Sequence, residues 1–478
     1  MDLWTPALLR HGLRRGLRHG PNHARAVLGL PLLGLWLCVA LLLGMAAPRT
    51  AGAQGITVAI GGALQDENAL VWQRLVLLAG GPGARYVVFA TAAGEPEAAA
   101  ARIVANLQRH GAVAEAIPVA PRLPGIDLAA AVQDPRWIER VGAARGVFFS
   151  GGAQSRLLDT LRPGGIDSPL LLAVRALWQR GGVVAGTSSG AAVLSTLAFR
   201  DAPDLIGALQ DPQGALRDRE EVDRGFGFLP PQIVVDQHFL KRGRIARLLP
   251  LLAARGLPLG LGVEEDSAAI VRGFEVEAVG AGGVLVVDLT DARHDAARKG
   301  VPLRLQGAAL SFLDSGDRYD LATRTLQPAR FKSRLLDPNA AGYRGHFSGD
   351  VFYPDMLADG AITTAMARLV DSNDAEVRGI SFRPQLALQG AAAPASPVSP
   401  AAPASPAAAA TAAAAAAASI GFEWRLYKGP ATRAHTSARQ DDYTLQAVLL
   451  DVTPITMARP LYTPLPRVPA APAPAAAR

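Results

Sequence analysis

The sequence of 478 residues has a single cysteine, few aromatic residues (6%) and few charged residues (19%). One cysteine excludes a disulfide framework and any zinc or iron–sulfur site that is built from several cysteines. That cysteine, Cys38, lies close to the N-terminus, so the remainder of the chain also excludes a catalytic thiol. We expect neither a metal ion nor another cofactor. The length leaves room for two or three domains with a large core.

Residues 1–53 have the three parts of an export signal. Five arginines precede an uncharged apolar run over residues 26–47, and Ala51-Gly52-Ala53 fits a signal-peptidase cleavage site before Gln54. The apolar run is also long enough to span a bilayer as an uncleaved anchor. We expect cleavage and a periplasmic or extracellular protein, which contacts the membrane only if the signal is uncleaved.

The formal net charge of +7 is concentrated in this signal. Six of the 48 basic residues and one of the 41 acidic residues belong to residues 1–53. Without them the net charge falls to +2, which removes most of the electrostatic attraction that a nucleic-acid partner would require. We therefore expect no nucleic-acid partner.

Short apolar runs alternate with segments of helical periodicity in the first half of the remaining chain. Such alternation predicts an α/β fold in which a doubly wound, mostly parallel sheet carries helices on both faces. In these sheets ligands bind beyond the carboxyl ends of the strands. The candidate strands lie at residues 56–60, 85–91, 146–150 and 182–185, and one candidate helix lies at residues 95–110.

In the second half of the chain the hydrophobic pattern predicts shorter strands, and the composition changes. We assign residues 54–390 to one domain, with a β-rich extension from about residue 268. Residues 391–419 contain only Ala, Pro, Ser, one Val and one Thr, a composition typical of a linker. Residues 420–465 have the pattern of a small β module, and residues 466–478 form a Pro/Ala tail.

The segment Gly186-Thr187-Ser188-Ser189-Gly190 is the strongest local motif. It follows a strand and precedes a helical segment, which is the context of a G-x-S-x-G nucleophile elbow. The glycines permit a sharp turn that exposes the Ser188 hydroxyl, and backbone N–H groups at the start of a helix favour developing negative charge. An ordinary glycine- and serine-rich loop is the alternative interpretation.

A serine nucleophile needs a base, and His238 is the best candidate by elimination. Of the histidines after residue 53, only His238 closes an apolar run, within Asp236-Gln237-His238-Phe239. Glu264, Glu265 and Asp266 follow another apolar run, and the residues alone do not choose between these acids. Three arginines after the histidine could bind carboxylates or form a solvated helix face, namely Arg242, Arg244 and Arg247.

Together these motifs resemble the cyanophycinase family of serine peptidases, which is related to α-aspartyl dipeptidase. The resemblance covers about residues 55–290 and implies a fold similar to class I glutamine amidotransferases. Four segments carry the resemblance and occur in the same order as in the family. They are Ser150-Gly151-Gly152-Ala153-Gln154, Gly186 to Ala191, Asp236 to Phe239 with the three arginines, and Gly262-Val263-Glu264-Glu265-Asp266.

The resemblance implies a role for each residue that matches a motif. Ser188 would be the nucleophile, His238 the base and Glu265 the acid that orients it, with the backbone N–H groups of Ser189 and Gly152 binding the oxyanion. The implied substrate is cyanophycin, a poly-aspartate with arginine on each side chain, and the product is the β-Asp-Arg dipeptide. A homodimer is also implied. The implied substrate-binding residues are Gln154, Asp236, Gln237, Arg242, Arg244 and Arg247.

Two positions depart from the family pattern. Ala153 stands where the family usually has an acid, which weakens the case for cyanophycin itself. Ser189 stands where alanine is usual, and this change leaves the backbone donor in place. A secreted esterase of the α/β-hydrolase type and a non-catalytic binding protein on the same fold are the alternative interpretations.

Overall fold

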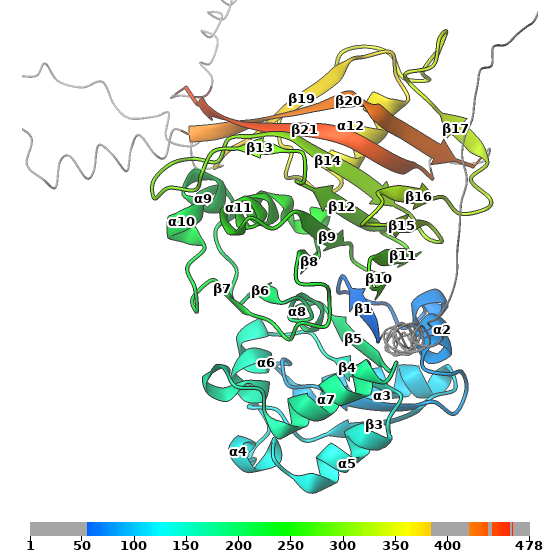
Figure 1. The fold of residues 1–478 in the computed structure, drawn as a ribbon, viewed down its shortest axis with the longest axis vertical. Coiled ribbons are helices and arrows are strands. Elements are labelled where there is room, and N and C mark those ends of the chain that lie inside the picture. Colours follow the sequence, from blue (N-terminus) through cyan, green and yellow to red (C-terminus); the bar gives the residue numbers. More distant parts are fainter. Residues whose placement is uncertain (1–54, 384–419, 438–441, 459–460, 462–478) are drawn as a thin grey trace, which may run out of the picture. The chain divides into compact units, whose positions relative to one another are not determined.

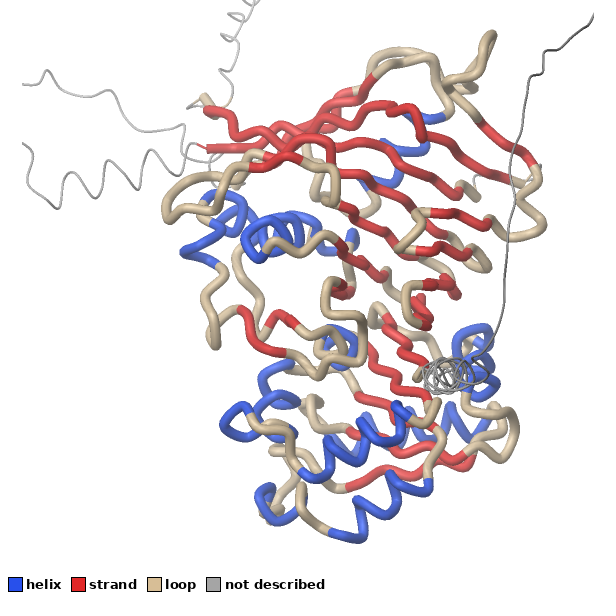
Figure 2. Tube along the Cα trace, in the orientation of Figure 1, coloured by secondary structure: helices blue, strands red, loops and turns tan. Residues whose placement is uncertain are grey.

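A computed structural model describes residues 55–383, 420–437, 442–458 and 461 of the chain. The predicted export signal, the linker over residues 391–419 and the tail over residues 466–478 lie outside the described residues. The described residues form two large sheets and one small one. Figure 1 shows the elements under the labels used below, and Figure 2 separates helices from strands by colour.

The first sheet has nine strands in the order β16-β15-β11-β10-β1-β5-β4-β2-β3. Its parallel part consists of β1 (Ile56–Ile60), β5 (Val183–Thr187), β4 (Gly146–Phe149), β2 (Arg85–Phe89) and β3 (Val113–Ile117). Beyond β1 the sheet continues with four antiparallel strands, β10 (Ser267–Arg272), β11 (Glu275–Gly280), β15 (Arg318–Asp320) and β16 (Thr325–Gln327).

Helices cover both faces of the parallel part, because alternate side chains of each strand point to opposite faces. In β4, Val147 and Phe149 pack toward α5, α6 and α7, whereas Phe148 packs toward α2 and α3. The predicted doubly wound α/β arrangement is therefore confirmed. The helices of this half are α2 (Ala69–Leu78), α3 (Pro96–Arg109), α4 (Leu128–Ala131), α5 (Pro135–Ala143), α6 (Gln154–Leu161), the 3-10 turn η1 (Pro163–Gly165), α7 (Pro169–Gln179) and α8 (Ser189–Ala192).

Local sequence explains where several of these helices begin. Asn68 caps α2 by accepting from the Val71 N–H, and Ser168 caps α7 by accepting from the Leu171 N–H. Asp134 caps α5, and Pro135 follows at the first helical position, where a missing N–H costs nothing. These caps set the ends of the connections between the parallel strands.

The second sheet contains ten strands and is mostly antiparallel. Its main path is β18-β19-β20-β21-β14-β12-β9-β8, with β13 paired to β14 and β17 paired to β20. At one edge, β8 (Ile233–Gln237) and β9 (Leu259–Val263) run parallel and are connected through η2 (Leu240–Arg242) and α11 (Ile245–Arg255). The other strands are β12 (Val284–Asp288), β13 (Arg293–His294), β14 (Leu305–Leu313), β17 (Arg334–Leu336), β18 (Phe352–Tyr353), β19 (Glu376–Ser381), β20 (Ile420–Thr436) and β21 (Thr444–Thr456).

The strand β8 belongs to this second sheet and not to the parallel part of the first. Its side chains still reach the core of the first sheet, because Ile233 and Val235 pack into the same cluster as β4 and β5. Val234 points the other way, toward α11 and the second core. The end of β8 therefore meets the end of β5 through packing between sheets rather than through pairing within one sheet.

The described residues 420–436 and 444–456 correct the expectation that residues 420–465 form a separate small module. They form β20 and β21, which lie between β19 and β14 inside the second sheet. Phe422 and Trp424 are completely buried in the core that this sheet forms with α11 and α12 (Ala361–Val370). Burial of large aromatic side chains against the rest of the sheet explains why these strands do not stand apart.

The remaining elements connect the two large sheets in sequence. They are β6 (Leu197–Phe199) and β7 (Val222–Arg224), which form the small sheet, with α9 (Leu205–Gln210) and α10 (Pro212–Ala215) between them. Within the described residues, no helix has the length and apolar character needed to cross a membrane. The same residues contain no group of three or more His, Cys, Asp or Glu side chains that is arranged to hold a metal ion.

Candidate active site

Ser188 lies on a sharp turn between β5 and α8, as the G-x-S-x-G pattern predicts. Its φ of 52° is positive, a strained conformation for a residue with a side chain. A Cβ at position 186 would come within 2.1 Å of the Gly190 carbonyl oxygen, and one at position 190 would come within 2.4 Å of the Phe149 carbonyl oxygen. Both glycines are therefore required for the tight approach of strand, turn and helix.

His238 follows β8 directly and also has a positive φ, 47°. Its Nε2 lies 2.9 Å from Ser188 Oγ, and its Nδ1 lies 2.6 Å from Glu265 Oε1. The structure thus joins a serine from the first sheet to a histidine and a glutamate from the second. Only 6% of His238 is exposed, so the imidazole is largely shielded from water, whereas 29% of the Glu265 side chain is exposed.

The turn after β1 holds the three segments that carry these side chains. The Ile60 carbonyl accepts from Ser188 N at 2.9 Å, the Gly61 carbonyl from His238 N at 2.7 Å and the Gly62 carbonyl from Asp266 N at 2.9 Å. Three consecutive carbonyl groups therefore set the spacing of the serine, the histidine and the acidic turn.

Gly62 leaves the room that the imidazole needs. A Cβ at this position would lie 2.3 Å from His238 Nε2 and Cε1, much closer than atoms in contact allow. Gly61 and Gly62 directly follow the strand expected over residues 56–60, and no function was predicted for them. Their position at a carboxyl strand end, where ligands bind in doubly wound sheets, was the available signal.

The three acids after β9 have separate partners. Glu265 contacts the imidazole, and Asp266 accepts from Gln65 N at 2.9 Å and from Asn68 Nδ2 at 2.8 Å. Glu264 accepts from the backbone N–H of Leu240 at 2.5 Å and thereby anchors the start of η2. Burial raises the pKa of Glu264 to about 7 despite this hydrogen bond.

The surroundings of His238 favour its neutral form. Burial is the main cause that lowers the pKa of His238, and the positive charges of Arg242 and Arg244 lower it further. The hydrogen bond to Glu265 acts in the opposite direction without reversing the shift. A neutral imidazole that donates from Nδ1 to Glu265 leaves Nε2 free to accept the Ser188 proton.

Backbone N–H groups beside Ser188 form a candidate oxyanion site. A Cβ on Gly151 would lie 3.0 Å from Ser188 Cβ, so the Gly151-Gly152 turn lies directly against the serine. Among the described residues, neither Gly152 N nor Ser189 N donates to a protein acceptor. The Ser189 hydroxyl lies 2.6 Å from Gly152 O and 2.9 Å from Gln154 Oε1, which ties this turn to the elbow.

A cavity of about 320 Å³ opens next to Ser188 and His238. Most of its lining is apolar, with the stacked rings of Trp72 and Phe148, whose centroids are 5.9 Å apart, among the lining residues. Arg102 adds a positive charge to the lining and is held by Asp66 at 2.7 Å. Trp72 on α2 and Arg102 on α3 lie far from the motifs in the chain, so no sequence pattern indicated that they line this cavity, whereas Phe148 stands two residues before the Ser150 segment.

Comparison with known proteins identifies the family. Residues 58–279 match the model of peptidase family S51. The cyanophycinase of Geminocystis herdmanii is 32% identical over 53% of this chain and 88% of its own length. The chain belongs to peptidase family S51.

Further relatives extend this comparison. The cyanophycinase of Thermosynechococcus vestitus is 34% identical over 58% of this chain and 82% of its own length. A crystal structure of a peptidase from an acI-B1 Actinobacterium is 22% identical, with a TM-score of 0.40, and covers 56% of this chain and 98% of that one. Membership of family S51 makes the chain a serine-type peptidase, and the matched residues include Ser188, His238 and Glu265.

Two of the substrate-binding residues implied for this S51 peptidase form a buried ion pair with each other instead. Arg247 Nε lies 2.7 Å from Asp236 Oδ2 and its Nη2 lies 2.6 Å from Oδ1, with 1% and 0% of the two side chains exposed. The guanidinium also stacks on Phe199, 4.1 Å from the ring centroid. Neither side chain lines the cavity beside Ser188, which corrects the expectation that both contact substrate.

The other implied residues of the S51 peptidase differ in exposure. Gln237 is buried, and Arg244 is 11% exposed and donates to the Gln237 carbonyl at 2.7 Å. Gln154 is half-buried beside Ser189, and Arg242 is exposed to solvent. Arg242 is therefore the only one of the six that is exposed, and neither Arg242 nor Gln154 lines the cavity beside Ser188.

Proposed function

We propose that this S51 peptidase is exported and hydrolyses cyanophycin, or related β-linked aspartyl peptides, to dipeptides of the β-Asp-Arg type. The similar proteins from Geminocystis herdmanii and Thermosynechococcus vestitus are named cyanophycinases, which supports this substrate class. The observation that carries the proposal is the hydrogen-bonded line from Ser188 through His238 to Glu265. Such a line activates a serine hydroxyl for acyl transfer.

In the proposed first step, Ser188 Oγ attacks the carbonyl carbon of the scissile amide while its proton moves to His238 Nε2. The carbonyl oxygen becomes an oxyanion, which accepts hydrogen bonds from the N–H groups of Ser189 and Gly152. Glu265 stabilises the imidazolium through Nδ1–H. The C–N bond then breaks, His238 returns its proton to the leaving amine, and the acyl group remains on Ser188 as an ester.

Water completes the proposed cycle. His238 takes a proton from a water molecule, whose oxygen attacks the ester carbonyl and forms a second oxyanion at the same donors. When the ester C–O bond breaks, the proton returns from His238 to Ser188 Oγ, and the acid product leaves. The lowered pKa of His238 favours this cycle at neutral pH, because the neutral imidazole is the acting base.

The charges near the serine support a substrate that bears carboxylates. Arg242 is exposed and close enough to His238 for its charge to lower the pKa of the imidazole. On another side of the site, Arg102 lines the cavity that contains Ser188. Guanidinium groups pair with carboxylates in a planar, bidentate geometry, and cyanophycin presents a carboxylate on every arginine that it carries.

Export is part of the proposal and is supported by the sequence of residues 1–53. Their basic start, apolar run and small-residue site have the order of a cleavable signal. The cell fractions that contain the protein, and the N-terminal sequence of the processed form, test this part. Retention of residues 1–53 in a cytoplasmic protein would contradict it.

Two reactions test the catalytic part of the proposal. A fluorophosphonate should label the wild-type protein and not the Ser188→Ala variant. Ser155→Ala is the matched control, because Ser155 lies on the neighbouring helix α6 outside the hydrogen-bonded line. Labelling that survives in Ser188→Ala, in a protein with unchanged circular dichroism, would show that a different residue is the nucleophile.

Substrate identity has its own test. The wild-type protein should release β-Asp-Arg dipeptide from cyanophycin, as measured by mass spectrometry, and Ser188→Ala should not. A protein that reacts with the fluorophosphonate but cleaves neither cyanophycin nor β-aspartyl peptides would retain the serine mechanism and refute the substrate.

A further inference from the structure

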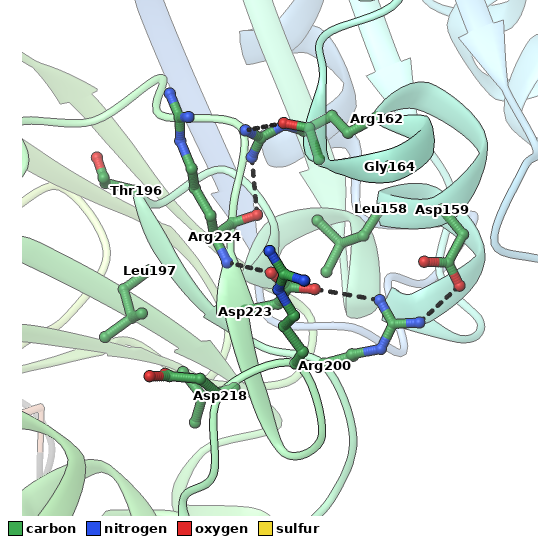
Figure 3. A pocket seen from close by; sticks show the side chains of 13 residues that line it. Leu158, Asp159, Arg162, Gly164, Thr196, Leu197, Arg200, Asp218, Asp223 and Arg224 are labelled. Carbon is green, nitrogen blue, oxygen red and sulfur yellow. Dashed lines mark hydrogen bonds and ion pairs between the residues drawn. The ribbon is translucent and has the colours of Figure 1, made fainter.

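A second and larger cavity, of about 790 Å³, lies between α6, η1, β6 and β7 (Figure 3). It shares no lining residue with the cavity beside Ser188. Four arginines and three aspartates contribute to its lining, whereas the lining at Ser188 contains a single arginine and no carboxylate. Its volume falls within the usual range for ligand sites, and its charge suggests a ligand with charges of its own.

Most of these charges are already paired within the protein. Figure 3 shows the Arg200 guanidinium between the carboxylates of Asp159 and Asp223, at 2.7 and 3.2 Å. Arg162 is buried, pairs with Asp167 outside the cavity and donates to backbone carbonyls. These groups build the walls, and they do not need a ligand to balance their charge.

Arg219 and Arg224 differ from the other arginines of the cavity. Both are exposed, and among the described residues neither side chain forms an ion pair. Figure 3 shows the Arg224 guanidinium extended away from the Arg200 ion pairs, without a marked partner. Burial is the main cause that lowers the pKa of Arg162, and the positive charge of Arg224 lowers it further, so the two guanidinium groups are close enough to repel each other. An anion bound there would relieve this repulsion.

The walls also offer acceptors for cations. Asp159 and Asp218 keep 61% and 71% of their side chains exposed, although each already pairs with one arginine. A ligand that carries both carboxylates and guanidiniums would therefore find partners of both signs in one cavity. On the proposed function, the substrate polymer has this composition in every repeating unit.

Helix α6 connects this cavity to the catalytic elbow. Its first residue, Gln154, contacts the Ser189 hydroxyl, and Leu158 and Asp159 on the same helix line the cavity. Five helical residues span about 7.5 Å along the axis. Roughly two residues of extended backbone span the same length. One polymer chain, or that chain and a neighbouring chain in a granule, is therefore long enough to contact both the cavity and the catalytic elbow.

We propose that the cavity between α6 and β7 is a second binding site for the polymer substrate, in which Arg219 and Arg224 bind carboxylates of the chain. The inference rests on the proposed function, since it takes its ligand from that substrate. The site would hold the enzyme on an insoluble polymer while the serine cleaves nearby units.

Binding to cyanophycin granules tests the proposal without catalysis. The protein carrying Ser188→Ala should sediment with granules, and adding Arg219→Gln and Arg224→Gln should weaken the apparent affinity by about tenfold, as expected for the loss of two partly exposed ion pairs. Arg85→Gln with Arg122→Gln is the matched control, because it removes two exposed charges that do not line either cavity. Equal binding by the two double variants would overturn the proposal.

A second measurement separates this site from the active site. In the enzyme with Ser188 intact, the double variant should lower the ratio of turnover on granules to turnover on a short β-Asp-Arg peptide by about tenfold, because only the granule extends to both cavities. An unchanged ratio would overturn the second site and leave the proposed function standing. Granule binding that depends on Arg219 and Arg224, in an enzyme that does not cleave the granules, would instead refute the proposed function alone.

Discussion

The two large sheets contribute differently to the site. The first is wound by helices on both faces and supplies Ser188 from a glycine-rich elbow. The second is mostly antiparallel and supplies His238 and Glu265 from the ends of the parallel strands β8 and β9 at one edge. The nucleophile and its base are therefore parts of different sheets, and neither sheet contains a complete hydrogen-bonded line by itself.

Strand β1 and the turn that follows it fix the position of the serine relative to the histidine and the glutamate. The last carbonyl of β1 and those of Gly61 and Gly62 bind one backbone N–H each from the serine, histidine and acid segments. Backbone hydrogen bonds of this kind depend little on side chains, so they hold positions that substitutions elsewhere disturb only weakly. Precise placement matters because small displacements of a reacting group reduce the rate strongly.

The largest expected effect comes from removing either contribution. Ser188→Ala and His238→Ala should each lower kcat by about 10⁴-fold or more, because both act in the same proton transfer. The double variant should lose little more than either single variant, as groups that act as a unit are not additive. Steady-state kinetics measure the three values. If the fold-loss of kcat in the double variant equals the product of the two single losses, the two sheets contribute independently.

The next effect concerns the buried pair beneath the histidine. Asp236→Asn leaves the Arg247 charge without its partner in the core and should lower the free energy of unfolding by about 3–5 kcal/mol. Glu220→Gln is the control, since it breaks an exposed pair with Arg217 and should cost less than about 1 kcal/mol. Urea unfolding compares the two. Equal costs would indicate that the β8–α11 region opens to water more readily than its burial implies.

This pair also shows a limit of prediction from sequence. Asp236 and Arg247 are charged residues next to a candidate base, a pattern that favours contact with substrate. Their burial depends on Gly243, whose left-handed conformation ends η2 and sets the direction of α11, so that the guanidinium points back at β8. Spacing along a continuous helix contains no information about such a break.

Other features were predictable because they are local. The alternation of strands and helices predicted the doubly wound half, and Gly186 and Gly190 predicted the turn at Ser188. Local sequence could not predict which of Glu264, Glu265 and Asp266 contacts the imidazole. In the structure Glu264 is bound at the start of η2 and Asp266 at the turn after β1, so Glu265 is the acid that remains for the imidazole. The place of β20 and β21 inside the second sheet depends on their pairing with β19 and β14, strands that precede residues 391–419 in the chain, and no periodicity reveals such pairing.

A smaller effect tests whether β1 aligns the two sheets through Gly62. Gly62→Ala would place a Cβ about where the imidazole lies and should lower kcat/KM by about 10²-fold by displacing His238. Gly80→Ala is matched to it, because Gly80 has a similar φ (113° against 104°) but open space around its Cα. Both variants bear the cost of a positive φ, and only Gly62→Ala meets the ring. Equal losses of activity would assign the effect to backbone strain and not to the position of the histidine.

The smallest effect concerns charge at the junction of the two sheets. The pKa of His238 lies below its ordinary value, so the acid limb of kcat/KM should lie at lower pH than the limb of an unperturbed imidazole, whose pKa is about 6.5. Arg242 disfavours the imidazolium, so Arg242→Gln should raise this pKa and move the acid limb of the pH profile to higher pH. Added salt should shift the wild-type limb in the same direction by screening the arginine. A limb that stays in place in both experiments would mean that burial alone, and not the arginines after β8, keeps the base neutral.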